Sequence, residues 1–283
     1  MTDHPITVAI DAMGGDNSPE VTVAGAILST RQNKFNVLLV GDKASLEKEL
    51  SKHDTENLSI KIIPSEGKIE DSEAPALGLR QKPKASIVVA TSLVKKGEAD
   101  AVVSMGSTGA TMAAAVVLLG TIDGIDRPAI GGPIVGSAPN QVILDLGSNL
   151  DCKPQQLVGF GVLGSVFSQD LLKIPNPKIG LLSVGSEEGK GNSQIKEATE
   201  LFKKSGLNFI GNIEGNDLVT GKADIVVCDG FVGNVVLKLV EGLSIGLANQ
   251  LQTALTNSPI PPEVMSGLIQ KLISDNNVVD ARG

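Results

Sequence analysis

Short apolar runs rich in β-branched residues alternate with helical patterns along almost the whole chain, and this alternation limits the possible folds most strongly. The predicted strands cover residues 7–10, 37–40, 59–63, 101–104, 142–146, 179–184, 209–211 and 225–228. The predicted helices cover residues 19–30, 43–52, 86–96, 109–119, 153–172, 193–204 and 233–255. Buried strands separated by helices predict an α/β fold, in which a mostly parallel sheet is covered on both faces. Residues 122–140, rich in Gly and Pro, interrupt the pattern and predict a subdomain connection or a hairpin.

Composition excludes several classes of protein. A net charge of −8 and the presence of only six Phe, with no Trp or Tyr, argue against nucleic-acid binding. Two cysteines form no disulfide framework and fit a reducing compartment. No basic-then-apolar leader is visible, and the longest apolar run, residues 113–119, is too short to span a bilayer. We therefore expect a soluble cytoplasmic protein, with residues 1–283 forming a single domain.

Glycine-bearing polar turns follow most of the predicted strands. Ligands bind at the carboxyl ends of strands in open parallel sheets, so these turns predict a binding site. The candidate ligand-binding residues in these turns are Asp11, Gly14, Gly15, Asp16, Gly106, Ser107, Thr108, Gly109, Asp145, Asn149, Gly185, Glu187, Asp229 and Gly230. The turns carry acids, amides, hydroxyls and one lysine, a set suited to electrostatic catalysis on an anionic substrate rather than to a nucleophilic triad. Without a cluster of His and Cys, we expect no zinc site and no cofactor.

The one lysine, Lys190, lies in the turn Gly185–Asn192 between a predicted strand and a predicted helix. Glycines on both sides of it allow backbone N–H groups to approach an anion, and the following helix adds a partial positive charge. The turn is not a P-loop, since the spacing from Gly185 to Lys190 is one residue short and Gly191 replaces the metal-binding hydroxyl. Lys190 is therefore either a solvated side chain or an anion-steering charge.

Several candidates also have a purely structural interpretation. Asp229 and Asn234 could cap a helix, while Asp11 and Asp16 could form a turn. Cys228 ends a predicted strand and is interpreted as a core residue.

A G-x-G-x-x-G sequence starts at Gly159, but it lies inside a predicted helix instead of between a strand and a helix, so it is no dinucleotide fingerprint. Its glycines predict close approach of another helix. We therefore expect the helix over 153–172 to lie in a dimer interface, with burial in the chain's own core as the alternative.

Six motifs in order carry a resemblance to a known family. They are Ile10-Asp-Ala-Met-Gly-Gly-Asp16, Gly106-Ser-Thr-Gly-Ala110, Gly124-Ile-Asp-Arg-Pro-Ala129, Leu144-Asp-Leu-Gly-Ser-Asn149 with Lys153-Pro154, Gly185 with Lys190-Gly-Asn192, and Asp229-Gly-Phe with Gly233-Asn234. The set resembles the bacterial phosphate acyltransferase family, PlsX, over residues 10–238. This resemblance implies a three-layer α/β/α sandwich like that of isocitrate and isopropylmalate dehydrogenases and of phosphotransacetylases. It also implies a homodimer.

The resemblance implies transfer of a fatty acyl group from acyl-acyl carrier protein to inorganic phosphate, giving acyl phosphate for phospholipid synthesis. Lys190 and Asn234 match the positions that the family uses in catalysis, and Lys153 joins the candidates for substrate binding. The chemistry fits the residues, because phosphate is itself the nucleophile and the protein only has to hold it and stabilise an oxyanion. Two other functions stay open: a phosphotransacetylase-like enzyme acting on acyl-CoA, and a non-catalytic anion-binding protein.

The chain departs from the family at its end. Family members continue with a Gly-Gly-Ala-Pro segment and further structure, so the resemblance implies a chain truncated at its C-terminus. Residues 242–273 contain few charges and predict a protruding helical hairpin. We expect residues 256–269 of this hairpin to contact the inner face of the membrane peripherally.

Overall fold

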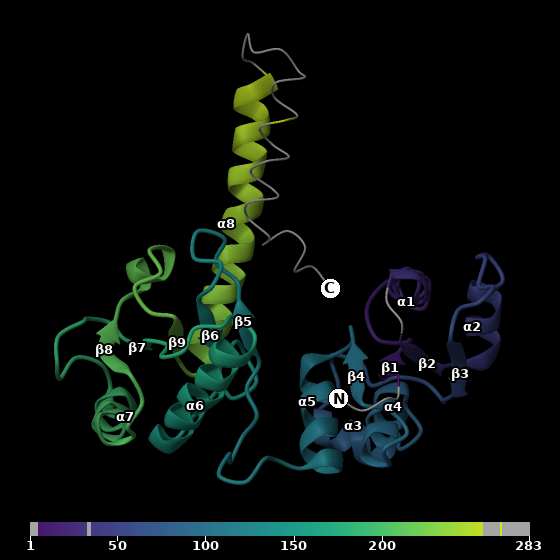
Figure 1. Ribbon diagram of the computed structural model, residues 1–283, viewed down its shortest axis with the longest axis horizontal. Helices are drawn as coiled ribbons and strands as arrows, with labels where there is room; N and C mark the ends of the chain where they lie inside the picture. The colour runs from purple at the N-terminus through teal and green to yellow at the C-terminus, as the bar shows by residue number, and fades with distance from the viewer. Residues whose placement is uncertain (1–4, 33–34, 257–266, 268–283) are drawn as a thin grey trace. The chain divides into compact units, whose positions relative to one another are not determined.

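The computed structural model describes residues 5–32, 35–256 and 267. The chain divides into two compact units, Met1–Thr121 (unit 1) and Ile122–Gly283 (unit 2). Each unit has its own sheet, with four strands in unit 1 and five in unit 2 (Figure 1). The α/β fold class with mostly parallel strands is confirmed.

Unit 1 is built on a fully parallel sheet with the strand order β3-β2-β1-β4. Its elements are β1 (Thr7–Asp11), α1 (Glu20–Gln32), β2 (Asn36–Gly41), α2 (Lys43–Leu50), β3 (Ile60–Pro64), α3 (Pro75–Gln81), α4 (Ser86–Lys95), β4 (Ala101–Ser104), α5 (Thr108–Ala114) and a π-helical turn, Ala115–Leu119. Both central strands, β1 and β2, therefore have parallel neighbours on each side. Their carboxyl ends form one edge of the sheet.

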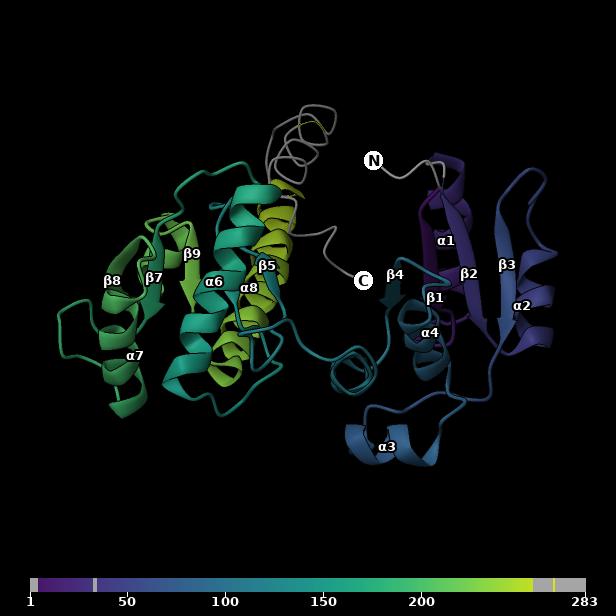
Figure 2. The same ribbon diagram turned by 60° about the horizontal axis from the view of Figure 1, so that its bottom comes forward.

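Alternate residues of β2 show that both faces of this sheet are covered. Val37 and Leu39 pack against α1 and α2, whereas Val40 belongs to the core beneath α4. Because successive strand residues point to opposite faces, these two cores lie on the two sides of the sheet (Figure 2). Unit 1 is thus a three-layer α/β/α arrangement.

Unit 2 has the strand order β5-β6-β9-β7-β8, in which only the β5–β6 pair is antiparallel. Its elements are β5 (Gly131–Pro133), β6 (Val142–Leu144), α6 (Pro154–Asp170), β7 (Ile179–Leu182), α7 (Ser193–Lys204), β8 (Phe209–Ile213), a 3-10 turn (Gly215–Val219), β9 (Ile225–Val227) and α8 (Gly230–Thr256). The β5–β6 hairpin lies in the region where the sequence predicted a hairpin or a subdomain connection.

The faces of the second sheet are covered in the same way. Val142, Ile179 and Ile225 pack against α6 and α7, while Ile143 and Val226 pack against the first turns of α8. The helices α6 and α8 therefore lie on opposite faces (Figure 2).

The glycines of α6 fit tightly against this core. A Cβ at Gly161 would lie 2.6 Å from the Phe202 ring, and a Cβ at Gly164 would lie 2.6 Å from Ile225 Cγ2. These two glycines face the unit's own α7 and β9, so burial in the chain's own core explains them. They no longer support a dimer interface on α6.

Helix α8 is the longest helix among the described residues and extends beyond the sheet on which it starts (Figure 1). Val236, Leu237 and Val240 pack on the core, but a row of apolar residues spaced by four stays uncovered. We call this row the outer ridge; it consists of Phe231, Val235, Leu239, Leu243, Leu247 and Leu251, each at least 39% exposed.

By length and composition alone, the first 22 residues of α8, 230–251, could cross a membrane. The sequence analysis did not predict this, because Lys238 and Glu241 divide the segment and no long uninterrupted apolar run remains. The predicted turn and second helix of the hairpin over 242–273 lie outside the described residues, apart from residue 267.

Candidate active site

The candidate catalytic residues of unit 2 follow three neighbouring strands. The order β6-β9-β7 is fully parallel, so the loops after these strands start from the same edge of the sheet. These loops cover residues 145–153, 228–229 and 183–192 and lead into α6, α8 and α7. The three helices therefore begin at this edge, where their N–H groups and positive dipole ends favour an anion.

The loop that carries Lys190 is shaped by glycines. Gly189 and Gly191 have φ angles of 90° and 97°, a conformation that favours glycine. Asn192 closes the loop by accepting the Ile195 N–H at 2.9 Å as the N-cap of α7. The side chain of Lys190 is exposed and makes no hydrogen bond or ion pair to another described residue. Its ammonium group is thus available to an anionic ligand.

Gly185 and Glu187 lie close to the stem of Lys190. A Cβ at Gly185 would lie 2.9 Å from Glu187 Oε2 and 3.0 Å from Lys190 Cγ. Any larger residue at this position would push the lysine stem aside. Gly185 therefore sets the path of Lys190, and both residues belong to the same loop as predicted.

The start of α8 is held by Asp229 and leaves Asn234 free. Asp229 Oδ1 accepts the Val232 N–H at 2.8 Å, so its role as a helix cap is present in the structure. The Gly230 N–H donates to the Asn149 carbonyl oxygen at 2.8 Å. Asn234 is exposed in the second turn, and its amide makes no side-chain hydrogen bond within the described part of the chain.

Asp145 and Asn149 bond to each other and to the surrounding backbone beneath this edge, instead of presenting their side chains to a ligand. Asp145 is completely buried, and its carboxylate accepts five hydrogen bonds from N–H groups. The side chain of Asn149 donates to Asp145 Oδ2 and to the Pro128 carbonyl oxygen, both at 2.8 Å. The predicted ligand contact of the Asp145 carboxylate does not fit this geometry, because its oxygens are already occupied.

Both cysteines lie beside the same loop. Burial, followed by the nearby carboxylates, raises the pKa of the Cys152 thiol to about 11, and burial also raises the pKa of Cys228. A thiol whose pKa is raised in this way stays protonated at neutral pH and is a poor nucleophile. Cys228 is a buried core residue, as its place at the end of a strand predicted.

Lys153, the remaining candidate of unit 2, directly precedes α6. Its backbone N–H donates to Gln156 Oε1 at 2.8 Å, and its own side chain is exposed.

Unit 1 gathers its own set of candidates at the carboxyl ends of β1 and β4. Asp11 is buried, and its Oδ2 accepts the Ser104 hydroxyl at 2.7 Å. Ser104 in turn accepts the Gly106 N–H at 3.0 Å. A Cβ at Gly14 would lie 2.7 Å from both Asp11 Oδ2 and the Gly106 nitrogen, so glycine allows the two loops to interlock. The second oxygen of Asp11, Oδ1, is buried and has no hydrogen-bond partner among the described residues.

The other candidates of unit 1 surround this contact. Gly15 has a φ angle of 92°, while Asp16 and Thr108 are exposed. Ser107 caps α5 by accepting the Ala110 N–H at 3.4 Å. Gly109 packs beside Pro75 of α3, since a Cβ there would lie 2.7 Å from the proline ring.

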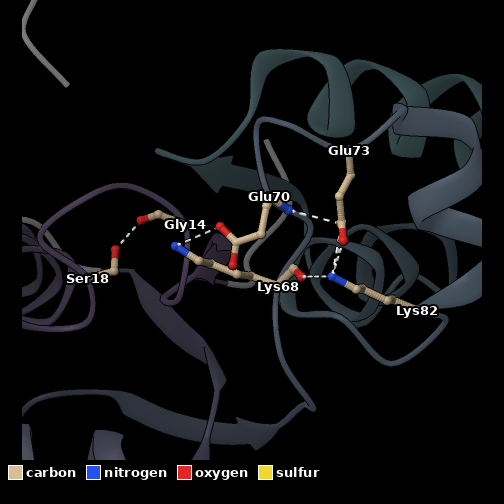
Figure 3. Close-up of polar contacts among 6 residues, drawn as sticks. All are labelled: Gly14, Ser18, Lys68, Glu70, Glu73 and Lys82. Atoms are coloured by element: carbon tan, nitrogen blue, oxygen red, sulfur yellow. Dashed lines mark hydrogen bonds and ion pairs between the residues drawn. The ribbon is translucent and has the colours of Figure 1, made fainter.

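A polar network closes the loop between β3 and α4 (Figure 3). The same figure shows Gly14, whose carbonyl oxygen accepts the Ser18 hydroxyl. Lys82 Nζ donates to Glu73 Oε1 at 2.6 Å and to the Lys68 carbonyl oxygen at 3.1 Å. Glu73 Oε2 also accepts the Glu70 N–H at 3.1 Å. One lysine thus ties together both ends of the loop.

The sequence reading missed three serines at the two edges. Ser104 bonds Asp11, while the buried hydroxyls of Ser148 and Ser183 have no hydrogen-bond partner within the described residues. Each serine ends a strand or lies in the loop that follows one, and this position was the available signal. Among the described residues, no group of three or more His, Cys, Asp or Glu side chains could hold a metal ion.

Comparison with known proteins identifies the family. The model of the family described as "Fatty acid synthesis protein" matches residues 6–272. The phosphate acyltransferase of Pelotomaculum thermopropionicum is 49% identical over 251 residues, which are 89% of this chain and 73% of that protein. The phosphate acyltransferase of Lawsonia intracellularis is 44% identical over 261 residues, or 92% of this chain and 75% of the relative. The chain belongs to the phosphate acyltransferase family. It is accordingly a transferase that moves an acyl group to phosphate.

Solved structures support the fold of this phosphate acyltransferase family member. A phosphotransacetylase, EutD, from Staphylococcus aureus aligns with a TM-score of 0.60 at 18% identity, covering 85% of this chain and 82% of that one. A branched-chain phosphotransacylase from Enterococcus faecalis V583 aligns with a TM-score of 0.50 at 21% identity, covering 82% and 83% of the two chains. The phosphotransacetylase-like part of the predicted fold is confirmed, and the dehydrogenase-like label stays a prediction.

Proposed function

We propose that this chain transfers a fatty acyl group from acyl-acyl carrier protein to inorganic phosphate, and that the acyl phosphate feeds phospholipid synthesis. The observation that carries the proposal is the pair of free side chains, Lys190 and Asn234, on loops and helix starts that share one sheet edge. One is a cation and the other an amide donor. Acyl transfer to phosphate needs both kinds of group, for the phosphate and for the developing oxyanion.

The reaction starts when a phosphate oxygen attacks the thioester carbonyl carbon. A carbon–oxygen bond forms, and the carbonyl electron pair moves onto the oxygen to give a tetrahedral oxyanion. When this intermediate collapses, the carbon–sulfur bond breaks and the carrier leaves as a thiolate that takes up a proton. Lys190 and Asn234 together stabilise the phosphate and the oxyanion, and no nucleophilic side chain is required.

The remaining candidates have supporting roles in this proposal. The positive dipole ends of α7 and α8 contribute partial positive charge to the phosphate site in unit 2. Proposed substrate contacts in unit 2 are Lys153, Gly185, Glu187, Asp229 and Gly230, and those in unit 1 are Asp11, Gly14, Gly15, Asp16, Gly106, Ser107, Thr108 and Gly109.

A direct assay tests this function. Purified protein is incubated with palmitoyl-acyl carrier protein and labelled phosphate, and labelled acyl phosphate is separated and counted. We expect product with the acyl carrier protein substrate and much less with palmitoyl-CoA or acetyl-CoA. Faster turnover of an acyl-CoA would instead favour the phosphotransacetylase-like function, and binding without any turnover would favour an anion-binding protein.

We further propose that the enzyme is a cytoplasmic homodimer that contacts the inner face of the membrane peripherally. The outer ridge of α8 supports this, because an exposed apolar row of this length is typical of a surface that another molecule covers. Leu243→Asp with Leu247→Asp should lower the mass in sedimentation or the recovery with floated liposomes, whereas Gln250→Asp on the same helix should not. Residues 256–269, the expected membrane contact, lie outside the described residues except for 256 and 267.

A further inference from the structure

We propose that Asp145 is a positioning residue, which fixes Asn234 and the start of α8 through the loop at residues 147–149. This inference rests on the proposed function in one respect, namely that Asn234 acts on the substrate. It assigns Asp145 to a structural task beneath the site instead of to substrate binding.

The first argument is the number of donors on the Asp145 carboxylate. Oδ1 accepts the backbone N–H groups of Ile130 at 3.1 Å, Gly147 at 3.3 Å and Ser148 at 3.1 Å. Oδ2 accepts the backbone N–H of Asn149 at 2.7 Å and its side-chain amide at 2.8 Å. Within the described residues, no lysine or arginine pairs with it. The carboxylate thus folds the loop around itself, in the way that a nest of N–H groups folds around an anion.

The second argument is how closely this loop contacts α8. Gly147 has a φ angle of 142°, and a Cβ there would lie 3.5 Å from Asn234 Cβ and Oδ1. The backbone of Gly147 therefore faces the Asn234 side chain directly. The contact distance is ordinary, and it is the φ angle of Gly147 that favours glycine at this position.

Two glycines of α8 complete the contact from the other side. A Cβ at Gly230 would lie 2.8 Å from the Asn149 carbonyl oxygen, which already accepts the Gly230 N–H. A Cβ at Gly233 would lie 1.8 Å from the Asp145 carbonyl oxygen. The first turn of α8 thus rests on the loop backbone without intervening side chains. Any movement of the loop moves the helix start and Asn234 with it.

The substitution Asp145→Asn separates positioning from substrate contact. Whichever way the new amide points, its NH2 group faces at least two N–H donors that now lack an acceptor, so the loop must rearrange. A displacement of about 1 Å at a reacting group can lower kcat about a hundredfold. We expect such a fall in kcat for acyl transfer, because the displaced Asn234 no longer stabilises the charged intermediate.

A double-mutant cycle with Asn234→Ala gives the decisive comparison. If Asp145 acts through Asn234, the variant carrying both substitutions has the kcat of Asn234→Ala alone. If the kcat of the double variant falls by the product of the two factors measured for the single variants, Asp145 acts independently and the proposal is overturned. Asn149→Ala serves as a second, milder variant should Asp145→Asn fail to fold, and it should show the same dependence.

Hydrogen exchange tests the positioning role without any substrate. We expect faster amide exchange at residues 145–149 and 230–236 in Asp145→Asn. Asp224→Asn is the matched control, since Asp224 also accepts a backbone N–H, that of Lys178 at 2.7 Å, but precedes β9 at the opposite end of the strand. Unchanged exchange at 230–236 in Asp145→Asn overturns the proposal. If the wild-type protein shows no acyl transfer, the proposed function is overturned. The hydrogen-exchange comparison still tests the positioning role, because it uses no substrate.

Discussion

Asp11 and Asp145 occupy comparable places in the two units, at or just after the carboxyl end of a strand with a neighbour on each side. Both are buried, but Asp145 accepts five hydrogen bonds and Asp11 accepts one, with its Oδ1 left without a described partner. The Asp145 carboxylate is therefore satisfied without a ligand, whereas Lys190 and Asn234 at the same edge make no side-chain hydrogen bond within the described part of the chain. In unit 1 the unsatisfied group is the aspartate itself, a buried acceptor that a donor from elsewhere could satisfy.

The largest expected effect concerns the free groups of unit 2. Lys190→Ala should lower kcat by about 10²–10³, equivalent to about 2.7–4 kcal/mol, because one donor to the charged intermediate is lost. Its circular dichroism spectrum should not change, since the side chain is exposed and unbonded.

Lys196→Ala is the matched control for this variant, an exposed lysine in the first turn of α7. We expect its turnover to stay near that of the wild type. If Lys190→Ala and Lys196→Ala lose activity equally, the effect is not specific to the lysine of the candidate site.

The second prediction compares the two aspartates directly. Asp145→Asn should lower the free energy of unfolding by about 3 kcal/mol, because several buried N–H groups lose their acceptor. Asp11→Asn should cost about 1 kcal/mol or less, since it replaces an oxygen that has no donor. Urea unfolding followed by far-UV circular dichroism measures both. Equal losses would show that the number of hydrogen bonds does not distinguish the two edges.

The third prediction concerns how tightly the edge of unit 2 is packed. Gly233→Ala should destabilise the protein by about 1–3 kcal/mol, because the new methyl group collides with the Asp145 carbonyl oxygen. Gly246→Ala, farther along the same helix, meets no atom of the described residues within 4 Å and should stabilise by roughly 0.5–1 kcal/mol. Thermal melts of the two variants should therefore shift in opposite directions. A stabilising Gly233→Ala would refute the close contact.

The smallest effect is expected in the loop of unit 1. Hydrogen bonds from Lys82 and from the Glu70 N–H hold the pKa of Glu73 below its ordinary value of 4.5. A carboxyl group whose pKa is lowered by folding stabilises the folded state at pH values above its pKa in the unfolded chain. This contribution is lost as the pH falls through the pKa of the group in the folded protein. The stability difference between wild type and Lys82→Ala should thus shrink below about pH 4 and be small throughout, since both groups are partly exposed. A difference that grows on acidification would contradict this assignment.

Local patterns predicted most of the elements. Helix α7 has the predicted bounds because Asn192 caps its start and Gly206, with a φ angle of 75°, follows its end. Helix α8 starts three residues before its predicted position, since Asp229 is the cap. Helix α3 was missed, because seven residues starting with a proline show no clear period. The predicted helix over 109–119 divides into α5 and a π-helical turn.

What the sequence could not provide is the pairing of distant segments. The strand patterns do not show that β4 joins β1 in one sheet while β6 joins β9 in another. The same limit applies to the site. Glycines marked the correct loops, but the saturation of Asp145 depends on the Ile130 N–H, which only the β5–β6 hairpin brings close. The acidic side chain of Asp145 therefore predicted a ligand contact, whereas in the structure it accepts hydrogen bonds from the chain itself.

The outer ridge of α8 has a thermodynamic consequence, since the helix that carries it also carries Asn234. Leu251 lies seventeen residues after Asn234, which corresponds to about 26 Å along one rigid helix. In the proposed mechanism Asn234 contacts the substrate, so any surface that binds the ridge and shifts the helix would alter the free energy of substrate binding. By linkage, an occupied substrate site then changes the affinity of the ridge for that surface by the same factor.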